Sequence, residues 1–115
     1  IGFFTKYGDG GVDVSPIADL LKSEVRDLAD HLGIDKSIIN AVPTDGLWED
    51  DRSDEDQIGA SYEELEWALK YYDNNGPHFE SLDQRQSEVL EIYIGRHLSS
   101  RHKLEAPPVC LLEEE

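Results

Sequence analysis

Apolar residues recur at helical spacing over much of the chain. Between residues 17 and 32 they are separated by three or four positions, as on one face of an amphipathic helix. Gly33 follows directly and is a common helix stop. The pattern therefore predicts a helix over 17–32.

Two shorter elements are predicted on either side of this helix. Apolar and polar residues alternate over 12–15, which predicts a short strand whose length is limited by Pro16. A short turn of helix is expected over 36–40, and Pro43 ends it.

Capping boxes indicate two helices in the second half of the chain. Ser61 and Glu64 precede a run of apolar residues at helical spacing, and Ser81 and Gln84 precede another that continues to about Leu98. Each such signal contributes about 1 kcal/mol to a helix end. The chain is therefore predicted to be mainly α-helical, with about one short strand.

Two segments show no apolar period. The run "EDDRSDED" at 49–56 indicates a solvated acidic loop, and a divalent-metal site is the less favoured interpretation because the register of a calcium-binding loop is absent. Residues 99–115 contain two adjacent prolines, so we expect an extended tail that depends on docking against something else.

Composition narrows the classes of partner. The 115 residues are enough for one domain, and 26 acidic against 10 basic residues give a net charge of −16. Nucleic acid and anionic membranes are poor partners for such a chain, although a few cations in one cleft can still bind a small anion. No apolar run approaches a membrane span, and no signal peptide opens the chain. The single Cys110 cannot form an internal disulfide, which fits a reducing cytoplasm.

The glycine-rich stretch "FFTKYGDGGVDVSPI" at 3–17 is a candidate phosphate loop. It lacks the spacing of both common phosphate-binding motifs, so a turn is the favoured interpretation. Lys22, near the predicted helix start, favours a bound anion shared with free backbone amides. A helix that begins at Pro16, with Lys22 on its solvent face, is an equally good interpretation. The histidines and Cys110 lack the spacing of metal ligands or nucleophiles.

Four ordered blocks carry a resemblance to a known family. They are "GFFTKYGDGGVDVSPIADLLKSEVRDLADHLGI", "PTDGLW", "SDEDQIGASYEELEWAL", and "RHK" with "PPVC". From about Gly2 to Cys110, the chain resembles the C-terminal half of ammonia-dependent NAD synthetase. The resemblance implies an α/β fold, a Rossmann-like sandwich of the adenine nucleotide α-hydrolase type. It also implies an ATP-dependent ligase that adenylates deamido-NAD and then amidates it with ammonia, giving NAD, AMP and pyrophosphate.

The resemblance also implies site residues. The residues expected to contact deamido-NAD are Lys6, Asp13, His102 and Lys103, and those expected to contact ATP are Lys22 and Thr44. It assigns no catalytic residue and no metal ligand to this chain. The glycines at 8, 10 and 11 would let the backbone approach the ligand between Lys6 and Asp13.

Other parts of the family pattern do not occur in this sequence. The Ser-Gly-Gly-x-Asp-Ser loop that binds the ATP pyrophosphate belongs to the N-terminal half, as do the Mg²⁺ ligands. Methionine is absent, so we expect a processed product or a piece of a longer chain, inactive by itself. The expected partners are deamido-NAD, ATP, ammonia and a second copy in a homodimer, and bare apolar faces should make the segment self-associate. The alternative is a stand-alone acidic helical module that binds a partner protein without catalysis.

Overall fold

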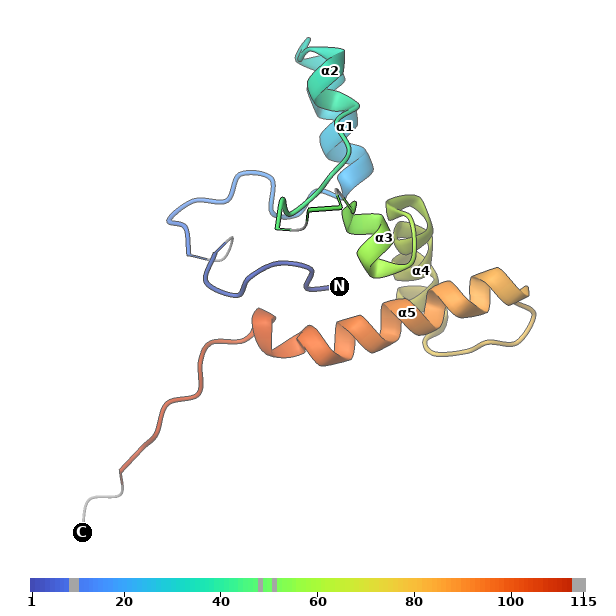
Figure 1. Cartoon of the computed structure of the whole chain (residues 1–115). Helices are drawn as coiled ribbons and strands as arrows, with labels where there is room; N and C mark the ends of the chain where they lie inside the picture. The colour runs from blue at the N-terminus through green and yellow to red at the C-terminus, as the bar shows by residue number, and fades with distance from the viewer. Residues whose placement is uncertain (9–10, 48, 51, 113–115) are drawn as a thin grey trace.

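The computed structural model describes residues 1–8, 11–47, 49–50 and 52–112, and the regular secondary structure of this part of the chain is helical (Figure 1). Its elements, in order, are α1 (Lys22–His31), α2 (Lys36–Ile39), α3 (Asp54–Ile58), α4 (Tyr62–Asn75), α5 (Gln84–Ser100) and the 3₁₀ helix η1 (Arg101–Leu104). The described residues contain no strand, so the α/β sandwich implied by the resemblance is represented here by helices alone.

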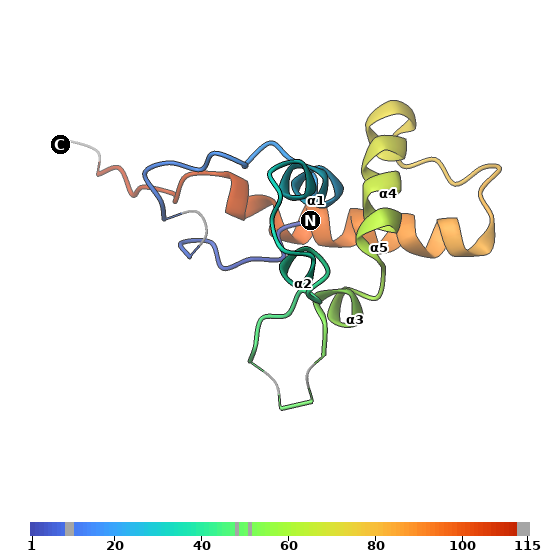
Figure 2. The same cartoon turned by 90° about the horizontal axis from the view of Figure 1, so that it is seen from above.

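Helices α4 and α5 form the core (Figure 2). They pack against each other through small and branched side chains, together with the end of α3. The buried residues are Ile58, Ala60, Leu65, Ala68, Val89, Leu90 and Tyr93. Helix α1 contributes no buried residue and projects from this pair together with α2 (Figure 1).

The two capping predictions had different outcomes. At α4 the box is confirmed: the Ser61 hydroxyl accepts from the Glu64 N–H at 3.1 Å, and the Glu64 carboxylate accepts from the Ser61 N–H at 2.9 Å. At α5 the predicted pair is wrong, because Asp83 caps the helix and Gln86 completes the box. Ser81 instead has a φ of 70°, in the left-handed region of a preceding turn.

The acidic run at 49–56 is only partly a loop, which corrects the prediction. Ser53 accepts a hydrogen bond from the Asp56 N–H, and α3 then runs from Asp54 to Ile58. Three acids in its first turn favour this helix, because carboxylates there offset the positive end of the helix dipole. Asp51 lies outside the described residues.

The predicted strand over 12–15 is wrong. These residues are exposed and have no strand partner among the described segments, and a strand needs a neighbour to pair its backbone groups. The long helix over 17–32 is shorter than predicted: residues 16–19 form turns, and α1 begins at Lys22. The short helix after it is confirmed, with Asn40 as its C-cap.

The C-terminal segment leaves the body of the molecule (Figure 1). Helical structure continues through α5 and η1, so the extended part begins at Glu105, and not at residue 99. The radius of gyration is 17.5 Å, against about 13 Å for a compact domain of this size. Among the described helices none has the length and apolarity needed to cross a membrane.

Candidate functional site

A hollow of about 360 Å³ lies between α1, α2 and the segment that follows α2. Lys22 and Arg26 line it from α1, and Thr44 lines it from the connecting segment. The rest of its wall is apolar and consists of Val25, Ala29, Ile38, Ile39, Ala41, Val42 and Pro43. The structure thus brings the two predicted ATP contacts, Lys22 and Thr44, to one hollow, together with a second cation.

Lys22 is the first residue of α1, so the interpretation that starts the helix at Pro16 is wrong. Its ammonium lies 5.3 Å from the centroid of the Tyr62 ring on α4, a cation–π distance. Two backbone amides at this helix start have side-chain acceptors. The Leu21 N–H donates to Glu24 at 2.7 Å, and the Ser23 N–H donates to Glu66 at 2.9 Å.

The Thr44 hydroxyl is held within a turn. It donates to the Arg52 carbonyl at 3.2 Å and accepts from the Gly46 N–H at 3.1 Å. Asp45, the next residue, accepts from the Leu47 N–H at 3.1 Å and from the Gln57 side chain at 3.3 Å. Thr44 is an exposed residue, and its hydroxyl already makes these two hydrogen bonds.

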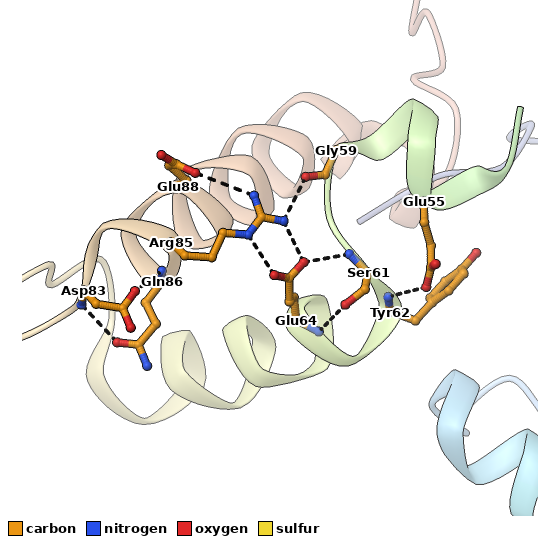
Figure 3. Close-up of polar contacts among 9 residues, drawn as sticks. All are labelled: Glu55, Gly59, Ser61, Tyr62, Glu64, Asp83, Arg85, Gln86 and Glu88. Atoms are coloured by element: carbon orange, nitrogen blue, oxygen red, sulfur yellow. Dashed lines mark hydrogen bonds and ion pairs between the residues drawn. The ribbon is translucent and has the colours of Figure 1, made fainter.

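The start of α3 fixes this turn relative to α4. The Asp54 N–H donates to the Pro43 carbonyl at 2.9 Å, directly before Thr44. The Asp54 carboxylate in turn accepts from the Tyr62 hydroxyl at 2.9 Å. The pKa of Tyr62 is raised to about 12, mainly by burial and secondly by this hydrogen bond. Its hydroxyl is therefore a donor at neutral pH. Figure 3 shows Tyr62 with its backbone N–H bonded to Glu55, which ties α4 to α3 a second time.

The four residues predicted to contact deamido-NAD lie on the two terminal segments. The Lys6 ammonium is 5.7 Å from the centroid of the Tyr7 ring, and Asp13 is exposed in the loop before α1. His102 is exposed on η1. Lys103 lines a hollow of about 330 Å³ with the segment at 2–5, and that lining includes none of the other three.

Gly8 and Gly11 lie in consecutive turns that are closed by backbone hydrogen bonds. The Gly8 N–H donates to the Thr5 carbonyl at 3.0 Å, and the Gly11 N–H donates to the Gly8 carbonyl at 3.1 Å. A Cβ on Gly11 would lie 2.5 Å from the Tyr7 carbonyl oxygen. Close approach within the turn thus accounts for Gly11 without a ligand, and Gly10 lies outside the described residues.

Sequence reasoning missed three residues near Lys22. Arg26 lies one helical turn after it, and the spacing of four could have revealed this neighbour. Tyr62 stands at the start of the apolar run after Ser61, and this position gives no sign of a contact with Lys22. Glu66, which accepts from Ser23, has no local signal, because the two residues are 43 positions apart. Within the described ranges, no three or more His, Cys, Asp or Glu gather into a group that could hold a metal ion.

Comparison with known proteins identifies the family. The family model for NAD synthase matches residues 1–107. The chain belongs to the NAD synthase family. This family has the nucleotide α-hydrolase fold, in agreement with the resemblance in the sequence. No solved structure matches the chain.

Curated relatives within the family agree with this assignment. The chain is 40% identical over 114 residues to the NH(3)-dependent NAD(+) synthetase of Archaeoglobus fulgidus, covering 99% of this chain and 43% of the relative. It is 46% identical over 109 residues to that of Picrophilus torridus, covering 93% of this chain and 40% of the relative. It is 38% identical over 115 residues to the NH(3)-dependent NAD(+) synthetase of Syntrophomonas wolfei, covering 100% of this chain and 41% of the relative. The chain thus spans about two fifths of the length of these relatives.

Proposed function

We propose that this chain is the C-terminal portion of an ammonia-dependent NAD synthetase and supplies substrate contacts to its active site. In the proposed reaction, a carboxylate oxygen of deamido-NAD attacks the α-phosphorus of ATP and displaces pyrophosphate. The nitrogen of ammonia then attacks the acyl carbon of this adenylate. AMP leaves with the oxygen that joined it to the acyl carbon, one proton of the ammonia is released, and NAD is formed. The names of the relatives support the ammonia-dependent formation of NAD.

The observation that carries the proposal is the pairing of Lys22 and Thr44 on one hollow. They come from different segments of a chain with a net charge of −16, yet the hollow presents two cations and a hydroxyl. Cations of this kind can neutralise the phosphate oxygens of ATP. The Thr44 hydroxyl would add a neutral donor by exchanging its bond to the Arg52 carbonyl for one to a phosphate oxygen. Close charges prevail over distant ones because salt screens interactions beyond about 8 Å.

The remaining predicted residues would hold deamido-NAD. Lys6 supplies a cation near the glycine-rich turn, and Asp13 can accept hydrogen bonds from ribose hydroxyls or an amide. His102 and Lys103 would approach from η1, next to the N-terminal segment that Lys103 contacts. As the family resemblance implies, the Mg²⁺ that accompanies ATP would be bound by residues outside this chain.

The test compares this chain with the longer protein that we propose contains it. Each is incubated with deamido-NAD, ATP and ammonium, and NAD, AMP and pyrophosphate are quantified. The longer protein should form the three products in equal amounts. The chain alone should form no NAD, because a ligase deprived of its pyrophosphate loop and metal loses most of its transition-state stabilisation.

Two results would contradict the proposal. NAD formation by the chain alone would refute its dependence on other segments. A longer protein that forms no NAD, or that hydrolyses ATP without consuming deamido-NAD, would favour the alternative of an acidic helical module that binds a protein partner.

A further inference from the structure

One face of α4 holds the first turn of α1. Tyr62 and Glu66 are four residues apart, so they project from the same side of α4. Glu66 contacts Ser23, and Tyr62 contacts Lys22, the first two residues of α1.

Glu66 accepts two hydrogen bonds from Ser23. One carboxylate oxygen accepts from the Ser23 N–H at 2.9 Å, and the other accepts from the Ser23 hydroxyl at 2.7 Å. Both contacts are partly buried, and a charged acceptor makes each stronger than a neutral pair. Two bonds from one planar carboxylate fix both the position and the rotation of this helical turn.

Tyr62 supports the side chain of Lys22. Its ring lies 5.3 Å from the Lys22 ammonium, and its hydroxyl donates to Asp54 at the start of α3. Asp54 also donates its N–H to Pro43, beside Thr44. One set of contacts therefore links Lys22 to the turn that presents Thr44.

Packing alone would leave the start of α1 poorly fixed. The helix has no buried residue, so apolar packing holds it less firmly than it holds α4 and α5. A lysine on a movable helix would also lose more conformational freedom when it binds a phosphate. Polar contacts from α4 are thus the means of holding Lys22 in place before ATP arrives.

We propose that Glu66, assisted by Tyr62, is a positioning residue that holds Lys22 for ATP binding. This inference rests on the proposed function, because it requires that Lys22 contacts ATP. Glu66 acts through the Ser23 backbone and hydroxyl and does not itself touch the nucleotide.

A double-mutant cycle in the longer protein tests the inference. Lys22→Met should raise the KM for ATP about tenfold or more, and Glu66→Ala should raise it about three- to tenfold, as expected for loss of charge-assisted hydrogen bonds. In the Lys22→Met background, Glu66→Ala should add nothing further, because its effect passes through Lys22. If Glu66 has a purely structural role, Glu66→Ala should lower the melting temperature. It should then change the KM for ATP by the same factor whether residue 22 is Lys or Met.

Three further variants complete the design. Glu66→Gln can accept from the Ser23 N–H and donate to its hydroxyl, so it should restore most of the ATP affinity. Ser23→Ala removes one of the two bonds and should raise the KM for ATP about two- to threefold. Glu91→Ala removes the same charge from an exposed position of α5 and should leave the KM for ATP unchanged. If Glu66→Ala fails to fold, Ser23→Ala in both Lys22 backgrounds provides the same cycle.

The outcomes separate the two proposals. If Lys22→Met leaves the KM for ATP unchanged, the ATP role of Lys22 is wrong and the positioning role is refuted with it. If Lys22→Met raises that KM but Glu66→Ala does not, or if their effects multiply, the positioning role alone is refuted.

Discussion

The Lys103 ammonium donates hydrogen bonds to the backbone carbonyl of Gly2 at 2.6 Å and to that of Phe4 at 2.5 Å. One side chain thus joins η1 to the N-terminal segment. Gly2 also approaches the end of α5 so closely that a Cβ on it would lie 2.2 Å from the Ser100 Cβ. In this structure Lys103 has a role in folding, whereas its contact with deamido-NAD stays a prediction.

The first prediction concerns this link. Lys103→Met keeps the apolar stem of the side chain but removes both hydrogen bonds. A hydrogen bond from a charged donor contributes about 1.5–3 kcal/mol, so their loss should release the segment at 1–5. Trypsin cleavage after Lys6 should then become about tenfold faster or more, because proteolysis follows the population of the open form. Arg101→Met is the control, since the Arg101 side chain makes an exposed ion pair with Glu105 at 3.4 Å. Equal cleavage rates in the two variants would show that Lys103 does not hold the segment.

A second prediction follows from the ion pair between α4 and α5 (Figure 3). The Arg85 guanidinium donates to the two Glu64 oxygens at 2.8 and 2.7 Å, and the Ser61 N–H donates to the same carboxylate. These contacts lower the pKa of Glu64 from its ordinary value of 4.5 to about 2, Arg85 being the larger cause.

The sign of the pH dependence follows from the depressed pKa. The contribution of Glu64 to stability is complete above pH 4.5 and is lost as the pH falls towards 2. Urea unfolding at pH 7 and pH 3 should therefore show a smaller difference between the natural chain and Glu64→Gln at the lower pH. Added salt should also reduce the difference, because the pair is partly exposed. A difference that stays constant with pH would contradict the role of the ionised carboxylate.

The third prediction concerns self-association. Helix α5 buries Val89, Leu90 and Tyr93, whereas α1 has no buried residue. Exposed apolar side chains gather on α1, α2 and the segments next to them, namely Ile17, Leu28, Leu32, Ile34, Ile38 and Val42. Patches of this kind usually find a partner.

Light scattering of the chain should therefore give the mass of a dimer or a larger species. Replacing Leu32 and Ile38, which are 66% and 67% exposed, by Lys should restore the monomer without lowering the melting temperature. A natural chain that remains monomeric at high concentration would show that these faces need no cover.

The local signals in the sequence predicted the helices better than their ends. The Ser61–Glu64 box predicted the start of α4, since both partners of a capping box lie within one turn. For α5, Ser81–Gln84 and Asp83–Gln86 have the same spacing, and the sequence could not show which pair would cap the helix. The Ser53–Asp56 capping box of α3 was also present in the sequence. It was not used, because the acidic run that contains it was interpreted as a solvated loop.

The candidate site could be predicted only in part, for a related reason. Lys22 and Thr44 were assigned through family resemblance, and their common hollow depends on how α1 and α2 fold back on each other. The contacts of Glu66 with Ser23 and of Lys103 with Gly2 join residues 43 and 101 positions apart. No local pattern encodes such pairs, because they arise from tertiary packing.

The division of the predicted contacts between two substrates is the central claim, and matched lysine substitutions in the longer protein test it most directly. Steady-state kinetics would be measured for Lys22→Met and Lys6→Met, varying ATP and deamido-NAD in turn. Lys22→Met should raise the KM for ATP about tenfold or more and change that for deamido-NAD less than about twofold, and Lys6→Met should do the reverse. Unchanged KM values in both variants, or the same pattern from both lysines, would contradict the account.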